Sequence, residues 1–158
     1  GRITDVEIAN AFRKTVEAGG RSITPEALEN AVKAVDGFPY MMQLVGYRTW
    51  DVSENSPQIS ASDVQQGSLL ARMELRDRIL ETTYRELSDK DIEFLLAMLT
   101  DSGPSRVSEI AKRMGVASNY ASQYKRRLLE DGVIGERGRG LVGFDIPAFR
   151  EFLNEKAF

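Results

Sequence analysis

The 158-residue chain contains no cysteine and no histidine. Without cysteine it can form no disulfide, no thiolate metal site and no cysteine nucleophile. Without histidine it lacks the most common general base and the most common metal ligand of proteins. An enzyme built from this sequence would have to work with carboxylates, lysine or tyrosine alone. We therefore expect no catalytic residues, no metal site and no cofactor in this chain.

Long apolar runs are also missing. No stretch approaches the roughly 18 consecutive apolar residues that a membrane-spanning helix requires, and no secretory signal is visible. The lack of cysteine fits a reducing compartment, so we expect a cytoplasmic protein with no membrane partner. The first residue is glycine rather than methionine, and we expect the chain to be a piece of a longer protein.

Charge is unevenly distributed along the chain. The net charge of −3 does not favour a general polyanion binder. Residues 1–87 carry this charge and residues 88–158 are neutral overall, yet the stretch from Arg106 to Gly140 holds eight basic and four acidic residues. A nucleic-acid contact is therefore predicted within this stretch.

The first half of the sequence has helical periodicity and no alternating segments. N-cap residues at Thr4 and Thr24 precede two amphipathic helices. A third helix, which extends to Trp50, is apolar around most of its circumference and is expected to be the buried centre. We predict a helical domain over residues 1–59 and a long connecting helix over residues 60–87.

A helix-turn-helix is predicted in the second half. Ser88 is an N-cap for one helix, and residues 105–114 form a second, short one. Gly115 permits the positive φ of a tight turn, and Ser118 is expected to cap the helix that follows. This last helix is the candidate for reading DNA.

A β-hairpin and a closing helix complete the pattern. Two short apolar runs flank a basic, glycine-rich tip at residues 135–140, and Pro147 is expected to start the final helix. The order of elements predicts a winged helix-turn-helix domain over residues 88–158. The predicted fold class is thus mainly α, a helical domain followed by a winged helix with a small β-hairpin wing.

The faces of the candidate reading helix can be assigned from its periodicity. Ala121, Tyr124 and Leu128 are expected to face the core. Polar and basic residues of the outward face and of the wing are the types that contact bases and phosphates. The predicted DNA-binding residues are Ser118, Asn119, Ser122, Gln123, Lys125, Arg126, Arg127, Arg137 and Arg139.

Double-stranded DNA is the partner that we favour, but two alternatives stay open. Winged helices also serve as protein–protein interaction modules, and a mildly basic helix also suits an acidic protein surface. A free-standing transcriptional regulator with an effector or dimerisation domain is the third hypothesis. No feature of the sequence defines an oligomeric state.

A resemblance adds to this interpretation. The segment Gly37-Phe38-Pro39 opens an apolar helix, and by itself it is only a helix end followed by a helix start. Together with two preceding helices and a following winged helix, however, it resembles the C-terminal part of P-loop ATPases of the AAA+/STAND superfamily, especially the archaeal and bacterial Orc-like ATP-binding proteins. The resemblance implies a helical lid at residues 1–59, with Gly37, Phe38 and Pro39 as a nucleotide-sensing edge.

The resemblance also implies an upstream ATPase core as a partner, with ATP and magnesium as cofactors of the parent protein. The sequence contains no Gly-x-x-x-x-Gly-Lys-Ser/Thr motif. The phosphate-binding loop, its lysine and its magnesium-binding hydroxyl are therefore missing. We expect no ATP hydrolysis by this chain alone.

Overall fold

The computed structural model describes residues 2–157 and divides them into two compact units, Arg2–Ile79 and the residues from Leu80 onward. Each unit is mainly helical, and each has a small β-sheet. The fold class predicted from the sequence is confirmed. In chain order, the first unit contains α1 (Asp5–Ala18), β1 (Ser22–Ile23), α2 (Pro25–Val35), α3 (Pro39–Val52), β2 (Gln58–Ile59) and α4 (Ala61–Leu75).

Three helices of the first unit, α1, α2 and α4, begin at residues whose side chains cap them. Thr4 Oγ1 accepts a hydrogen bond from the backbone N–H of Glu7, and Thr24 Oγ1 accepts one from Ala27. Ser60 forms a full capping box at the start of α4. These residues satisfy backbone donors that a helix leaves open at its first turn. The caps predicted at Thr4 and Thr24 are confirmed.

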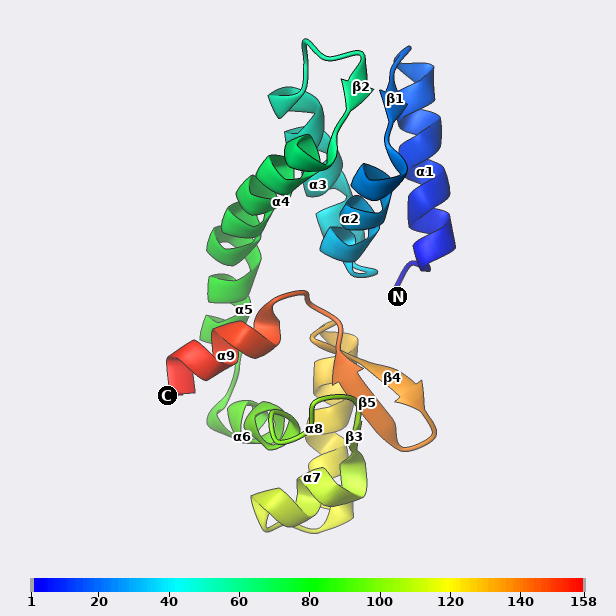
Figure 1. The fold of residues 1–158 in the computed structure, drawn as a ribbon. Coiled ribbons are helices and arrows are strands. Elements are labelled where there is room, and N and C mark those ends of the chain that lie inside the picture. The colour runs from blue at the N-terminus through cyan, green and yellow to red at the C-terminus, as the bar shows by residue number, and fades with distance from the viewer. Residues whose placement is uncertain (1, 158) are drawn as a thin grey trace. The chain divides into compact units, whose positions relative to one another are not determined.

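Two features of the first unit differ from the prediction. Ser22 and Ile23 pair in parallel with Gln58 and Ile59, so a short sheet joins segments that were expected to be entirely helical or loop (Figure 1). Trp50 is 36% exposed rather than buried. Its ring lies at the end of α3 under the guanidinium of Arg21, 4.6 Å from the ring centre. Packing in this unit therefore depends on tertiary contacts that helical periodicity does not show.

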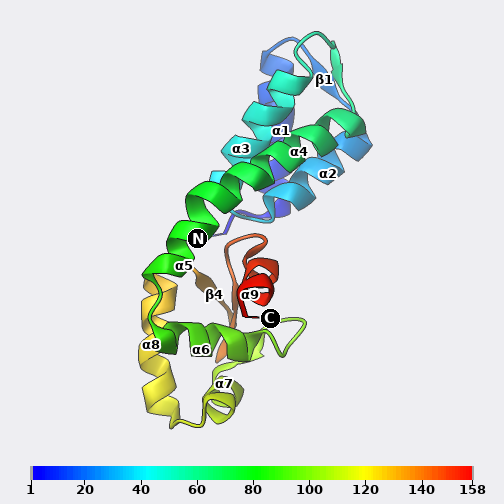
Figure 2. The ribbon, with the colours of Figure 1, turned by 90° about the vertical axis from the view of Figure 1, so that its left-hand side faces the viewer.

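The helix predicted as a connector is shared between the two units. Figure 2 shows α4 lying along α3, with which it makes its most extensive contacts, and α4 also packs on α2. A single-turn π-helix, η1 (Arg76–Leu80), follows, and α5 (Glu81–Glu86) belongs to the second unit. The boundary between the units thus falls at Ile79, inside the predicted connector, because α4 buries one face in the first unit.

The second unit has the predicted winged helix topology. Its remaining elements are α6 (Asp89–Met98), β3 (Ser105–Arg106), α7 (Val107–Met114), α8 (Ser118–Glu130), β4 (Ile134–Gly138), β5 (Leu141–Phe144) and α9 (Phe149–Ala157). The strands form an antiparallel sheet in the order β3-β5-β4. Gly115, at φ +71°, makes the turn between α7 and α8. Phe94, Leu95, Ile110, Leu128 and Phe149 fill the core of this unit.

Three helices of this unit begin at residues other than those predicted. Ser105 was expected to begin a helix, but it pairs with Val142 in the sheet, and α7 begins only at Val107. Ser118 is the first residue of α8 rather than its cap, which is Ala117, and Ala117 has no side-chain oxygen to accept a hydrogen bond. The closing helix starts at Phe149 instead of Pro147, because Ala148 adopts a φ of +64°.

Candidate nucleic-acid interface

The outward face of α8 is as the helical periodicity predicts. Ala121 and Leu128 are fully buried against the core of the second unit. The polar residues predicted to face outward are exposed, namely Ser118, Asn119, Ser122, Gln123 and Arg126. The Ser122 hydroxyl donates to the carbonyl oxygen of Ser118 at 2.9 Å. Asn119, Gln123 and Arg126 have no partner among the described residues, so their hydrogen-bonding groups are free for a ligand.

Tyr124 is only half-buried, although it was expected to be a core residue. Its ring packs against that of Tyr120, one helical turn earlier, with the ring centres 5.4 Å apart. Its hydroxyl lies 3.4 Å from the Tyr120 hydroxyl. This hydrogen bond raises the pKa of the Tyr124 phenol, and partial burial of the side chain raises it further. The two tyrosines thus pack on each other along one side of α8, and Tyr124 is not part of the core.

Three of the predicted basic contact residues have acidic partners within the domain. The Lys125 ammonium lies 3.6 Å from a carboxylate oxygen of Glu136. Arg137 turns back onto the hairpin, where it donates to the Asp145 carboxylate at 2.7 Å and to the Phe144 carbonyl at 2.8 Å. Their charge is thus partly neutralised before any ligand arrives.

Arg127 is the third of these residues, and its partner is buried. Its guanidinium donates to Asp91 Oδ2 at 3.1 Å, and the Asp91 side chain is only 3% exposed. The same carboxylate oxygen accepts from the backbone N–H of Ser88, the N-cap of α6. This ion pair joins α8 to the start of α6, so we interpret Arg127 first as a structural residue.

Arg106, Arg126 and Arg139 are exposed and have no acidic partner among residues 2–157. Arg106 is a candidate that the sequence analysis did not single out. Strand β3 places it opposite Leu141, and the next residue, Val107, donates its backbone N–H to the Gly140 carbonyl. Arg106 and Arg139 therefore both lie at the tip of the wing. Only the β3–β5 pairing reveals this, because the two residues are far apart in the sequence.

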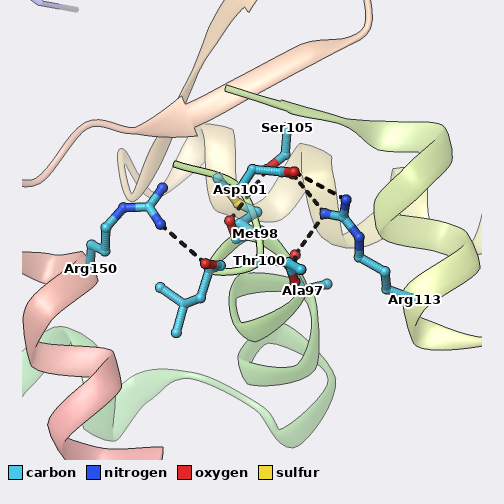
Figure 3. A network of polar contacts seen from close by, with 8 residues as sticks. Ala97, Met98, Thr100, Asp101, Ser105, Arg113 and Arg150 are labelled. Carbon is cyan, nitrogen blue, oxygen red and sulfur yellow. Dashed lines mark hydrogen bonds and ion pairs between the residues drawn. The ribbon is translucent and has the colours of Figure 1, made fainter. Parts of the chain in front are cut away.

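A polar network fixes the loop that leads from α6 into β3 (Figure 3). Arg113 makes a bidentate ion pair with Asp101, at 2.7 and 3.1 Å, and also donates to the Ala97 carbonyl. The Ser105 hydroxyl donates to Asp101 at 2.7 Å, and Arg150 donates to the Leu99 carbonyl. These contacts join α6, α7 and α9. They so hold in place β3, the edge strand that carries Arg106.

Asp101→Asn is expected to make the thermal stability of the second unit less dependent on pH in acid. Hydrogen bonds from Arg113 and Ser105 hold the pKa of the Asp101 carboxyl below its ordinary value. Stability that comes from a lowered pKa is present above the ordinary value, about 3.9, and is lost as the pH falls through the folded-state value. Melting curves by circular dichroism at neutral and acidic pH would measure the difference.

The control for this experiment is Asp131→Asn, which changes an exposed aspartate with no ion pair in the described part of the chain. It should lose stability in acid as the wild type does. If Asp101→Asn and the wild type melt in parallel at every pH, the ion pair with Arg113 does not contribute to acid sensitivity.

The predicted nucleotide-sensing edge has a structural explanation of its own. Gly37 adopts a φ of +71°, and its carbonyl accepts a hydrogen bond from Ile3 at 2.8 Å. Phe38 is the N-cap of α3, and Pro39 occupies the first turn, where a missing N–H has no cost. The contacts within residues 2–157 neither support nor contradict nucleotide binding at this edge, and the assignment stays a prediction.

Residues 2–157 bring together no cluster of acidic side chains suited to a metal ion. Among the described helices, none combines the length and the apolar character needed to cross a bilayer.

Residues 80–157 form a winged helix domain, as the order of their helices and the pairing of their strands show. A family model described as "Domain of unknown function (DUF8462)" matches residues 77–153. No curated protein matches the sequence.

Solved structures with a similar arrangement include the RuvB Holliday junction branch migration motor of Thermotoga maritima, with 19% identity and a TM-score of 0.41. That alignment covers 97% of this chain and 49% of RuvB. A proline-to-glycine mutant of the same protein gives 18% identity, a TM-score of 0.44 and coverage of 98% and 50%. The chain thus spans about half the length of these RuvB chains.

Proposed function

We propose that the winged helix of this chain binds duplex DNA through the outward face of α8 and the wing. The observation that carries the proposal is the set of unpartnered groups on that surface. Asn119, Gln123 and Arg126 present free donors and acceptors of the kinds that read base edges in a major groove. Arg106 and Arg139 add unpaired positive charge beside the wing tip, where backbone phosphates would lie.

The proposal extends to the parent protein. The order of elements and the Gly37-Phe38-Pro39 segment support a helical lid and winged helix from the C-terminal region of an AAA+/STAND-type P-loop ATPase. In such a protein, nucleotide bound by an upstream core would move the lid and so reposition the DNA-binding unit. The chain itself lacks the phosphate-binding loop, so we propose no ATPase activity for it.

One observation favours a second candidate function. Lys125, Arg127 and Arg137 are partnered internally, and the residues from Ser88 onward are neutral overall. Such a surface also suits a protein partner. The two functions differ in how binding depends on salt, because only phosphate contacts release the counterions condensed on DNA.

The experiment is a titration of a labelled duplex by fluorescence anisotropy at several salt concentrations. Each phosphate contact adds about −0.9 to the slope of log affinity against log salt, so the two unpaired arginines at the wing, Arg106 and Arg139, predict a slope of about −1.8. Glu136→Gln releases Lys125 from its partner and should steepen the slope to about −2.7. Glu136 is exposed, so this change should not unfold the domain.

Glu130→Gln is the matched control, because it changes the net charge equally but releases no cation from an ion pair in the described residues. Its slope should stay at the wild-type value. If no duplex binds at protein concentrations on the order of tens of micromolar in low salt, the interaction-module function replaces DNA binding.

A further inference from the structure

Helix α1 is fastened to the rest of the first unit at both of its ends. Before its first turn, the Ile3 N–H donates to the Gly37 carbonyl at 2.8 Å. After its last turn, the Arg21 guanidinium donates to the carbonyls of Ser53 and Ser56 and lies over the ring of Trp50. Gly19 packs so closely on that ring that a Cβ there would overlap it. The ends of α1 are thus held against the two ends of α3.

Between these attachments, α1 and α3 leave a cavity of about 560 Å³. Phe12, Val45 and Ile59 line its buried wall, and Tyr47 and Trp50 lie on its exposed side. None of the described residues that line it is charged. Its polar lining groups come from Thr15, Gln43, Thr49 and Tyr47.

This cavity opens to solvent on one side, where Thr15, Gln43 and Tyr47 are exposed. Its volume lies within the range of roughly 300–1,000 Å³ that small-molecule sites occupy. Gly46 contributes to the opening, because it projects no side chain from the middle of α3.

We propose that this cavity binds a neutral, largely apolar small molecule with an aromatic or similarly flat group. A charged ligand would find no counter-charge among the lining residues, and its transfer out of water would be unfavourable. The rings of Phe12, Tyr47 and Trp50 offer faces and edges on which a flat ligand packs. Gln43 and Thr15 can orient one polar group of such a ligand.

The proposed site is separate from the predicted nucleotide-sensing edge. Only Pro39 is common to that edge and the cavity lining. A nucleotide triphosphate needs cationic side chains or a phosphate-binding loop, and the lining offers neither. The proposal also does not depend on DNA binding, because every lining residue belongs to the first unit.

The test uses N-phenyl-1-naphthylamine, a neutral apolar fluorophore, with the 158-residue chain. Trp50 is the only tryptophan and lies on the cavity wall, so it reports binding through energy transfer to the probe. We expect saturable binding of one probe per chain, with quenching of Trp50 and little dependence on salt. Probe emission without quenching of Trp50, or uptake that does not saturate, would overturn the proposal.

Ala11→Leu is the informative variant, because Ala11 lines the cavity and a longer side chain there would fill part of it. We expect at least a tenfold loss of probe affinity. The matched control, Ala18→Leu, makes the same change on the same helix at an exposed position outside the lining, and should bind as the wild type does. Equal affinity in Ala11→Leu and the wild type would overturn the proposal, as would equal loss in both variants.

Tyr47→Ala keeps the test decisive if Ala11→Leu does not fold. Tyr47 is 63% exposed, so its truncation should leave the unit folded while it removes a ring from the cavity mouth. Probe affinity should fall several-fold. A folded Tyr47→Ala that binds the probe as tightly as the wild type would contradict the assignment of the site.

Discussion

Arg126→Ala is expected to weaken binding to a preferred duplex by about 5- to 150-fold. Arg126 is exposed on the outward face of α8 and has no ionic partner in the described residues, so its guanidinium is available for a base edge. Loss of one good base contact costs roughly 1–3 kcal/mol, which corresponds to this range of affinity. Gln123→Ala should behave in the same way, and both variants should discriminate less between duplexes of different sequence.

Arg139→Ala should have a different signature from these two variants. A contact of the wing tip with backbone phosphates carries no sequence information. Its loss should weaken all duplexes alike and reduce the slope of log affinity against log salt by about 0.9. Arg13→Ala, which removes an exposed arginine from the first unit, controls for the change in net charge. Anisotropy titrations with two duplexes at several salt concentrations would separate the signatures.

Two results would contradict this division of roles. If Arg13→Ala weakens binding as much as Arg126→Ala and Arg139→Ala do, the chain binds DNA through its overall charge, and α8 has no special part in it. If none of the four variants changes binding, the contact lies outside the second unit.

Local signals predicted the local parts of this fold. The predicted capping residues Thr4, Thr24 and Ser88 each accept the hydrogen bond expected of them, because a cap is formed within three residues along the chain. Gly115 makes the predicted turn for the same reason. The outward face of α8 also follows from periodicity alone, since Ala121 and Leu128 fix which side of the helix is buried.

The electrostatic state of the candidate site could not be predicted in this way. Arg127 and its partner Asp91 lie 36 positions apart in the sequence, and nothing local indicates that they meet. The sequence analysis therefore included Arg127 among the predicted DNA contacts, and it counted the charge of Arg106 without naming it as a contact. The β3–β5 pairing, which brings Arg106 to the wing, likewise joins residues that are distant in sequence.

The role of α4 shows the same limit at the level of domains. Its polar sequence suggested a connecting helix, although its buried face carries the small residues Gly67, Ser68 and Ala71 between Val64 and Leu75. A Cβ on Gly67 would lie 2.6 Å from the backbone nitrogen of Thr49 and also overlap the Thr49 hydroxyl. Small residues let two helix backbones approach closely, a feature that hydrophobic periodicity does not reveal.

Gly67→Ala is therefore expected to lower the free energy of unfolding of the first unit by about 3 kcal/mol, the upper part of the range for overpacking. The added methyl group meets backbone atoms of α3 rather than a flexible side chain, so α3 and α4 must separate to accommodate it. For an exposed connecting helix the sign would be opposite, because glycine in a helix interior is less favourable than alanine by about 1 kcal/mol. Urea denaturation followed by Trp50 fluorescence reports this unit specifically, since Trp50 is the only tryptophan.

Gly46→Ala supplies the control for Gly67→Ala, because Gly46 also lies within a helix but faces the cavity. A Cβ there would meet only the edge of the Phe12 ring, at 3.4 Å, which is close to ordinary contact. This variant should keep the wild-type stability or gain up to about 1 kcal/mol from helix propensity. If Gly67→Ala is as stable as Gly46→Ala, α4 does not pack on α3 in solution, and residues 60–87 form the connecting helix that the sequence predicted.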